Sequence, residues 1–144
     1  MFNKFGVLVF ILLCCSCKTL PQNKAEHSMP TATDPGTCNI EGKIVSIVEP
    51  SVKDTSSICS KYPCRAKVQI IKVFGCGAGI SLPVHGGDIV EMHFAYTLHS
   101  TEIFPGMKSH FRGLKKGDVF MAAASQRLVM GSGGEFVIYD YEVE

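Results

Sequence analysis

Residues 88–99 of this 144-residue chain have the sequence DIVEMHFAYTLH, which is the clearest strand pattern in the chain. Every second residue of this segment is apolar or aromatic, namely Val90, Met92, Phe94, Tyr96 and Leu98. The residues between and after them are largely polar, namely Glu91, His93, Ala95, Thr97 and His99. Because successive side chains of a strand point to opposite faces, this pattern predicts a strand with one face on a core and the other toward solvent or a partner.

Four further segments have strand character, and residues typical of turns separate them. They are residues 38–49, 64–74, 118–128 and 135–143. We expect a shared core-facing side for each of three sets: Ile40, Ile44 and Val48; Ala66, Val68 and Ile70; Val137, Tyr139, Tyr141 and Val143. No periodic helix of ordinary length is visible in residues 38–144. The sequence therefore predicts an all-β domain.

Five antiparallel strands in residues 38–144 fit a small closed barrel, which leaves no exposed strand edge. Gly42 lies inside the first strand and is expected to mark the bend where that strand serves both sides of the barrel. Residues 104–116, between the third and fourth strands, contain Pro105, Gly106 and Gly113, so they have room for only a short helical turn. An immunoglobulin-like sandwich is the competing fold, but it needs about seven strands.

Three stretches carry a resemblance to a known family. They are GKIV at residues 42–45, AKVQIIKVF at 66–74 and GLKKGDVFMA at 113–122. They resemble an OB-fold and, more narrowly, the netrin-like module shared by tissue inhibitors of metalloproteinases, over most of residues 38–144. The resemblance implies a five-stranded, antiparallel, OB-like barrel with a short helical turn between strands three and four.

The N-terminal residues predict export and lipid anchoring. Lys4 precedes an apolar run over residues 5–13, which is shorter than the roughly 20 residues that cross a bilayer and is typical of a signal peptide. The LCCSCK stretch at residues 13–18 resembles a bacterial lipoprotein signal, in which a cysteine behind a small residue is cleaved and lipidated. Cys17 fits best and Cys15 is the second candidate, although Cys14 stands where leucine is usual, three residues before Cys17. An ordinary cleaved signal is the alternative.

This interpretation divides the chain into three parts. Residues 1–16 are a lipoprotein signal peptide, residues 17–37 are the lipidated cysteine and a flexible tether with three prolines, and residues 38–144 are the barrel. Several acyl chains, such as palmitate, make a stable anchor at about 0.8 kcal/mol for each buried CH₂ group. The expected location is the cell envelope, at the outer membrane of a Gram-negative bacterium.

Besides the lipidated Cys17, four cysteines remain after cleavage, namely Cys38, Cys59, Cys64 and Cys76. An even number of cysteines in an oxidising compartment predicts two disulfides. Three pairings are open, and we favour Cys59 with Cys64 and Cys38 with Cys76. A metal site is the alternative, but the C-x4-C spacing is wider than in a usual zinc knuckle and no H-x3–5-H pair follows it. We therefore expect neither a metal nor another cofactor.

The charge balance limits the classes of partner. The 14 basic and 13 acidic residues give a net charge of +1, which excludes a nucleic-acid binder held by charge alone. Basic residues nevertheless gather in two short stretches, around residues 61–67 and 108–116. These stretches suit an anionic glycan or a phospholipid headgroup, or they form a merely solvated surface.

The sequence contains no pattern of catalytic residues. No two carboxylates have a spacing that indicates a general acid–base pair, and no G-x-S-x-G motif is present. We therefore expect a protein that is not an enzyme. The leading hypothesis is a lipid-anchored envelope binding or interaction module that docks an envelope protein or glycan. An oligosaccharide- or small-anion-binding lipoprotein is the alternative. Candidate ligand- or partner-binding residues are Arg65, Lys67, Gln69, His93, Thr97, Lys108, Arg112, Lys115 and Lys116.

A protease-inhibitor-like function, which rests on the family resemblance alone, is a remote alternative. In that family, the free α-amino group of an N-terminal cysteine chelates the zinc of the protease. Cys38 is internal in this chain, and Cys17 is expected to be acylated. The chemistry that such an inhibitor needs is therefore missing at both positions.

Overall fold

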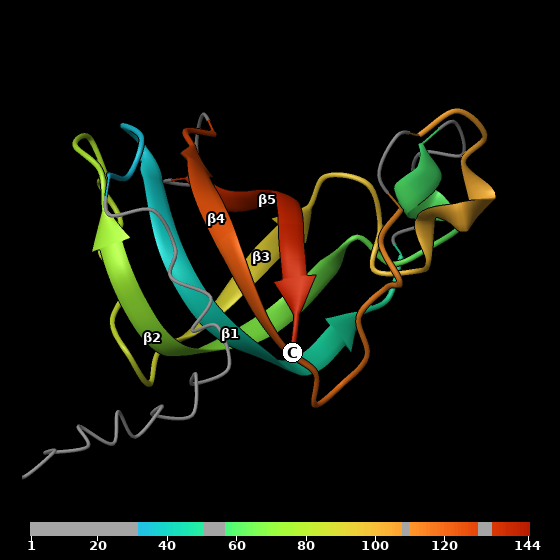
Figure 1. Ribbon diagram of the computed structural model, residues 1–144, viewed down its shortest axis with the longest axis horizontal. Helices are drawn as coiled ribbons and strands as arrows, with labels where there is room; N and C mark the ends of the chain where they lie inside the picture. The colour runs from blue at the N-terminus through green and yellow to red at the C-terminus, as the bar shows by residue number, and fades with distance from the viewer. Residues whose placement is uncertain (1–31, 51–56, 108–109, 130–133) are drawn as a thin grey trace, which may run out of the picture.

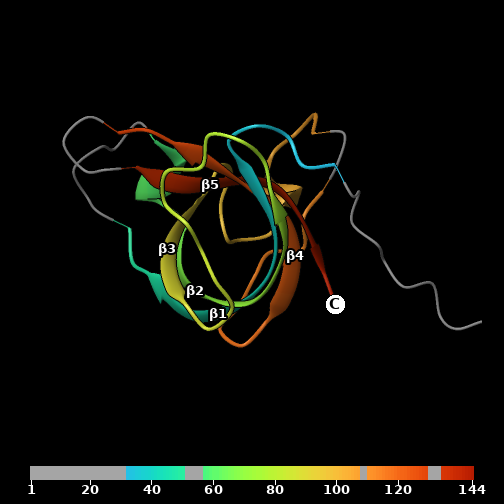
Figure 2. The ribbon, with the colours of Figure 1, turned by 90° about the vertical axis from the view of Figure 1, so that its left-hand side faces the viewer.

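Each of the five expected segments forms one strand in the computed structural model, which describes residues 32–50, 57–107, 110–129 and 134–144. The strands are β1 (Thr37–Val48), β2 (Arg65–Cys76), β3 (Ile89–Phe94), β4 (Val119–Arg127) and β5 (Glu135–Val143). They close into a barrel in the order β1-β2-β3-β5-β4 (Figures 1 and 2). The helical content of the described residues is two single 3-10 turns, η1 (Ile58–Ser60) and η2 (Thr101–Ile103).

The barrel is mixed, so the expectation of a fully antiparallel sheet is wrong. Four neighbouring pairs are antiparallel, but β3 runs parallel to β5, with Met92–Phe94 beside Phe136–Ile138. The reason is geometric: strand direction cannot alternate all the way round a closed ring with an odd number of strands. One pair has to be parallel, and it joins the strands that β4 separates in the sequence.

The barrel interior is filled by the inward faces of all five strands. Ala66, Val68 and Ile70 of β2 are buried, which confirms the alternation expected there. Three aromatic rings, those of Phe94, Phe120 and Tyr141, meet edge-on in the core. Their ring centroids are 5.8–6.3 Å apart. Edge-to-face contacts of this kind add to the free energy gained from burial alone.

Gly42 occupies the bend that the sequence predicted. β1 pairs with β2 along one edge and with β4 along the other, and its register with β2 shifts between Glu41 and Gly42. A Cβ atom at Gly42 would lie 2.6 Å from Cγ1 of Val68 and 3.3 Å from Cζ of Phe120. The close approach of these two strands over the core therefore requires glycine at this position.

A bulge in β1 overturns the expectation for Val48. The register with β2 shifts between Ile44 and Ser46, so that Ile47 lies opposite buried Ala66 and packs on the core. Val48 lies opposite Arg65 and lines the outer surface instead. An extra residue in one strand reverses the facing of every residue beyond it.

A second bulge overturns the shared face expected in β5. Ala122 of β4 pairs with Tyr141, whereas Ala124 pairs with Ile138, so β5 holds one more residue than β4 over this stretch. Phe136 and Ile138 face the core before the bulge and Tyr141 faces it afterwards, while Tyr139 is 47% exposed.

The third strand is shorter than expected, because the chain leaves the sheet after Phe94. Beyond that point Tyr96 is 43% exposed and Thr97 is 1% exposed, which is the reverse of the expected alternation. The Thr97 hydroxyl and the Leu98 amide both donate to the Pro63 carbonyl. The Ala95 amide still donates to the Ile138 carbonyl of β5, and the segment beyond it is held by the β1–β2 connection.

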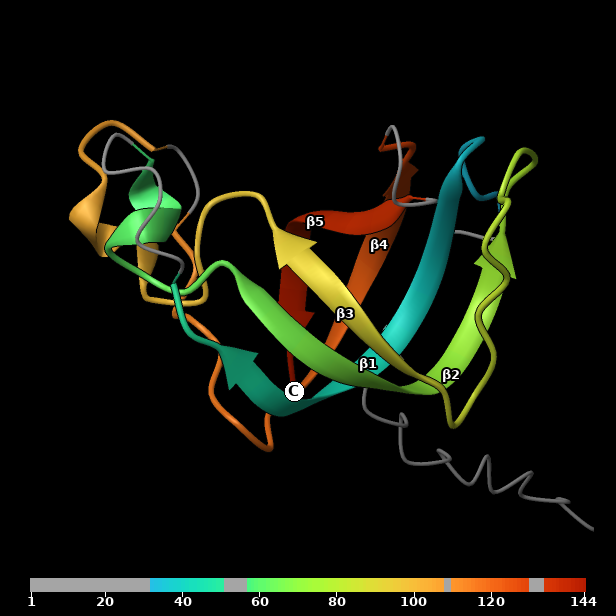
Figure 3. The ribbon, with the colours of Figure 1, turned by 180° about the vertical axis from the view of Figure 1, so that it is seen from behind.

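The helical turn expected within residues 104–116 is wrong as placed. A single 3-10 turn, η2, precedes that segment, and the described part of it is non-helical. The segment runs back along residues 97–101: the Leu114 amide donates to the Leu98 carbonyl over 2.8 Å. Gly113, at φ +86°, allows this close passage, because a Cβ there would lie 2.8 Å from the Leu98 oxygen. Figures 1 and 3 show both 3-10 turns together at one end of the barrel.

Both favoured disulfide pairs are confirmed. Cys38 in β1 is bonded to Cys76 at the end of β2, and Cys59 in η1 is bonded to Cys64 just before β2. The first bond joins partners of the β1–β2 ladder, since Cys38 and Cys76 are opposite each other in register.

The described part of the predicted tether lies against the barrel. The Gly36 amide donates to the Ala78 carbonyl over 2.7 Å, and the Asn39 side chain donates to the Thr33 hydroxyl. The residues expected to form the signal peptide, Cys15, Cys17 and the predicted tether up to residue 31 lie outside the described residues. Within the described residues, no helix has the length and apolar character needed to cross a membrane.

Candidate functional site

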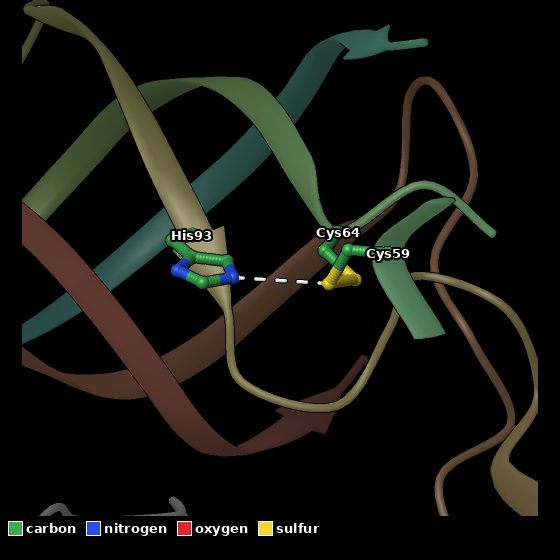
Figure 4. A group of neighbouring side chains, drawn as sticks. All are labelled: Cys59, Cys64 and His93. Carbon is green, nitrogen blue, oxygen red and sulfur yellow. Dashed lines mark hydrogen bonds between the residues drawn. A yellow bond between two sulfur atoms is a disulfide. The ribbon is translucent and has the colours of Figure 1, made fainter. Parts of the chain in front are cut away.

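His93 lies at the centre of a polar surface on the outer side of β2 and β3. Its neighbours in register are Arg65 of β2 and Val137 of β5, and its side chain is 25% exposed. The imidazole Nε2 lies 4.0 Å from Sγ of Cys59, within the Cys59–Cys64 disulfide (Figure 4). On the other side of the ring, Nδ1 lies 3.9 Å from Oε1 of Glu135 and has no hydrogen-bond partner.

The segment that carries the disulfide is fixed by local hydrogen bonds. The Ser57 hydroxyl caps η1 by accepting from the Cys59 amide, and the Ser60 hydroxyl donates to the Ser57 carbonyl. Cys64 is 4% exposed, and its carbonyl accepts from the Phe94 amide over 2.7 Å. The position of the sulfur atoms relative to β3 therefore follows from the backbone pairing.

Arg65 joins two carboxylates on this surface. Its Nη1 lies 3.2 Å from Oε1 of Glu91, and its Nη2 lies 3.1 Å from Oε2 of Glu135. The guanidinium is 50% exposed, so these pairs contribute little to stability, but they orient the group and balance its charge. Arg65 is consequently not the unpaired cation that binding of a free anion would favour.

The surroundings of His93 favour its neutral form. Burial lowers the pKa of the imidazole from its ordinary value of 6.5; Glu135 opposes this effect, and the positive charges of Arg65 and Arg127 add to it. A neutral imidazole carries a free lone pair on one ring nitrogen, which can accept a proton or bind a metal.

Two open cavities adjoin this surface. The larger, of about 400 Å³, lies between the β1–β2 connection and the strands, and it is lined by Val48, Glu49, Pro50, Ser57, Cys59, Ser60, Cys64, Arg65 and His93. The smaller, of about 280 Å³, is lined by Arg65, Glu91, Met92, His93, Val129, Gly134 and Glu135. Arg65 and His93 line both cavities, so they lie on the ridge between them. We call Arg65, Glu91, His93, Glu135 and the Cys59–Cys64 disulfide the β2–β3 site.

The other candidates on these strands have two different placements. Lys67 and Gln69 are exposed on the outer face of β2, and Lys67 lies opposite Glu91 in register. Thr97 is buried and its hydroxyl is hydrogen-bonded to the Pro63 carbonyl, so the expectation that it lies on the outer face is wrong.

The second basic stretch lies apart from the β2–β3 site. Arg112 and Lys115 line another cavity, of about 330 Å³, together with Ile47, Pro63, Leu98, His99, Ser100, Gly113 and Leu114. Arg112 lies 3.9 Å from Asp118, and Lys116 is exposed. No residue lines both this cavity and the β2–β3 cavities. Lys108 lies outside the described residues.

Sequence reasoning missed the two acidic residues of the site. Glu91 was detectable, because it shares the outer parity of the third strand with His93. Glu135 was not, because it comes beside His93 only through the parallel pairing of β3 with β5.

Comparison with known proteins gives no match from which the role of this site could be taken. No protein-family model, curated protein or solved structure matches the chain. The chemistry of the β2–β3 site therefore has to be inferred from its own residues.

Proposed function

We propose that this protein is a lipid-anchored binding module of the cell envelope, without catalytic activity, that docks an envelope protein on the outer face of β2 and β3. One observation carries the proposal: the barrel order and the position of the cavities match the way OB-folds bind ligands. In OB-folds the face of strands two and three and the loops between strands one and two and strands four and five hold the ligand. Both cavities of the β2–β3 site lie there, beside Glu49–Pro50 and Val129 respectively.

The charges of this face favour a polar partner of mixed charge. Arg65 and Lys67 provide two positive charges, and Glu91 and Glu135 provide two negative charges, so the face sums to zero. A polyanion would gain nothing from such a surface, whereas a protein surface with both signs would be complementary to it. The acylated cysteine at Cys17 supplies the attachment to the membrane in this proposal.

A neutral oligosaccharide is the second candidate ligand. Its support is the cavity of about 400 Å³, which falls within the usual 300–1,000 Å³ of small-molecule sites and presents hydrogen-bonding groups on its walls. The protease-inhibitor-like alternative receives no such support, because the nitrogen of Cys38 is a peptide amide within β1 and not a free α-amino group.

Crosslinking in intact cells, followed by affinity recovery and mass spectrometry, tests the leading proposal. The variant Arg65→Gln/Lys67→Gln removes both positive charges of the face, and we expect it to lose a specific envelope protein that the wild type recovers. The matched control is Lys115→Gln/Lys116→Gln, which removes two charges from the separate basic stretch and should retain that protein. Equal recovery with both variants would overturn the proposal for this face.

Calorimetry of the purified protein with neutral envelope oligosaccharides tests the alternative. Heat of binding that disappears in the Arg65→Gln/Lys67→Gln variant would assign the face to a glycan. A negative result in both the crosslinking and the calorimetric experiment would contradict a binding function of the β2–β3 site. Thermal unfolding of each variant shows whether the barrel itself is intact.

A further inference from the structure

We propose that Cys59, Cys64 and His93 form a zinc site when the Cys59–Cys64 disulfide is reduced. The two sulfur atoms and one ring nitrogen of His93 all lie within 4.8 Å of one another. Among the described residues, this is the one group of three side chains with potential ligand atoms so close together. Thiolate and imidazole are the ligands that zinc prefers in proteins.

The existing sulfur–nitrogen separation is close to that of a tetrahedral site, whereas the two sulfurs are still bonded at 2.03 Å. With Zn–S bonds of about 2.3 Å and Zn–N bonds of about 2.05 Å, tetrahedral angles place sulfur and nitrogen about 3.6 Å apart and two sulfurs about 3.8 Å apart. Nε2 of His93 is already 4.0 Å from Sγ of Cys59. Formation of the site therefore needs the disulfide to break and the two sulfurs to separate, and Cys59 belongs to the 3-10 turn η1 rather than to a strand of the barrel.

His93 also has the outer partner that a zinc-binding histidine usually has. Its Nδ1 is directed at Glu135, 3.9 Å away, and Glu135 is held in turn by Arg65. Zinc-binding histidines commonly donate their second ring N–H to a carboxylate, which fixes the tautomer and leaves the other nitrogen free for the metal. The hydrogen-bond partner that Nδ1 lacks would be gained by a small approach of the Glu135 carboxylate.

The cavity of about 400 Å³ gives a cation access to the sulfurs. Cys59, Cys64 and His93 all line this cavity, so the metal would bind at its wall. Three protein ligands leave the fourth position of a tetrahedral zinc for a water molecule from the cavity. In the sequence, the C-x4-C spacing of Cys59 and Cys64 argues against a metal site. The structure adds a third ligand, His93, which belongs to β3 and lies far from the cysteine segment in the sequence.

Reduction of the Cys59–Cys64 disulfide, which has to precede zinc binding, uses a dithiol reductant. The reductant supplies two electrons and two protons, the Cys59–Cys64 bond breaks to give two thiols, and the reductant becomes a disulfide. Binding of Zn²⁺ then displaces the two thiol protons to solvent, because the thiolates are the ligands. The metal thus stabilises the reduced form, while oxidation releases it.

The test uses the mature full-length protein. The protein is first reduced by a dithiol and then exchanged into a buffer that contains a phosphine reductant. Zn²⁺ is then titrated in competition with a chromogenic chelator. We expect one equivalent of Zn²⁺ to bind, and the Cys59→Ser/Cys64→Ser variant to bind none. That variant keeps Cys38 and Cys76, so it controls for reduction of the second disulfide. His93→Gln is expected to weaken binding by at least about tenfold, because removal of a ligand costs more than removal of an outer-shell partner.

His99→Gln is the matched control for the histidine, since the His99 ring lies at the same end of the barrel but packs at a tilt against Tyr62, with ring centroids 5.1 Å apart. Unchanged zinc affinity in His93→Gln, or equal losses in both histidine variants, would overturn the assignment of His93. Substitution of Co²⁺ in the wild type provides a readout that does not depend on the folding of any variant. Absence of a thiolate-to-cobalt charge-transfer band in the reduced wild type would overturn the metal site, whereas the partner-binding proposal is tested by crosslinking of the oxidised protein.

Discussion

His93 illustrates how a single side chain acquires its properties from three separate parts of the chain. It belongs to β3, its Nε2 faces the disulfide that precedes β2, and its Nδ1 faces Glu135 at the start of β5. Burial removes water from the ring, and the nearby Glu135 carboxylate only partly compensates for that loss. The lowered pKa of His93 is therefore a consequence of the tertiary contacts that partly bury the ring on the outer face of the barrel.

The lowered pKa of His93 predicts a pH dependence of stability. Because the folded protein binds this proton less readily than the unfolded chain, the free energy of unfolding is unaffected above the unfolded pKa of 6.5 and decreases as the pH falls below it. Denaturant unfolding at about pH 7.5 and about pH 5 should show a larger loss of stability for the wild type than for His93→Gln.

The matched control for this measurement is His110→Gln, at an exposed loop histidine. The wild type and His110→Gln should lose stability similarly on acidification. If His93→Gln shows the same loss as these two proteins, the neutral, buried state of His93 is contradicted.

At the scale of the element, the bulge in β5 decides which aromatic side chains reach the core. Tyr139 and Tyr141 have the same parity in the sequence, yet Tyr141 is 8% exposed and Tyr139 is 47% exposed. Tyr141 contacts three rings, since it stacks on Phe111 at 4.8 Å and meets Phe94 and Phe120 edge-on. Tyr139 instead accepts a surface hydrogen bond from Arg127. The bulge thus divides β5 into two parts with opposite alternation: Phe136 and Ile138 face the core before it, and Tyr141 faces the core after it.

The two tyrosines provide a direct test of this bulge. Tyr141→Ala should lower the free energy of unfolding by about 3–5 kcal/mol, because it removes a large aromatic ring from the core. Tyr139→Ala should lower it by no more than about 0.5 kcal/mol, as is usual for an exposed position. Equilibrium unfolding in guanidinium chloride measures both values, and comparable losses for the two variants would contradict the bulge.

At the scale of the whole molecule, the two disulfides constrain loops of very different size. The Cys38–Cys76 bond spans 38 residues and joins β1 to the far end of β2, whereas the Cys59–Cys64 bond spans five residues at the site. Cys38 also belongs to the buried core of the barrel. The first bond thus restricts the unfolded chain far more than the second does.

This difference predicts unequal contributions to stability. In the chain-entropy description, loops of these sizes correspond to about 4 and about 2 kcal/mol respectively. Cys38→Ala/Cys76→Ala should therefore destabilise the barrel about twice as much as Cys59→Ala/Cys64→Ala, measured by chemical unfolding without reductant. A greater loss from the second variant would show that the site disulfide, rather than the ladder disulfide, holds the fold.

The sequence by itself determined the positions of the five strands, the core-facing side of β2 and the number of disulfides, whereas the structure decided among the three possible pairings. These features depend on local alternation, on turn residues and on the number of cysteines, all of which are visible along the chain. Gly42 belongs with them, because a glycine inside an apolar strand indicates a bend.

Only the tertiary structure decided the parallel pairing of β3 with β5, the bulges in β1 and β5, and the burial of Thr97. Each depends on register between segments far apart in the chain, and a shift of one residue reverses the side that a residue faces. The β2–β3 site depends on the same closure, because Glu135 and the Cys59–Cys64 disulfide reach His93 from opposite sides only when the ring of five strands is complete.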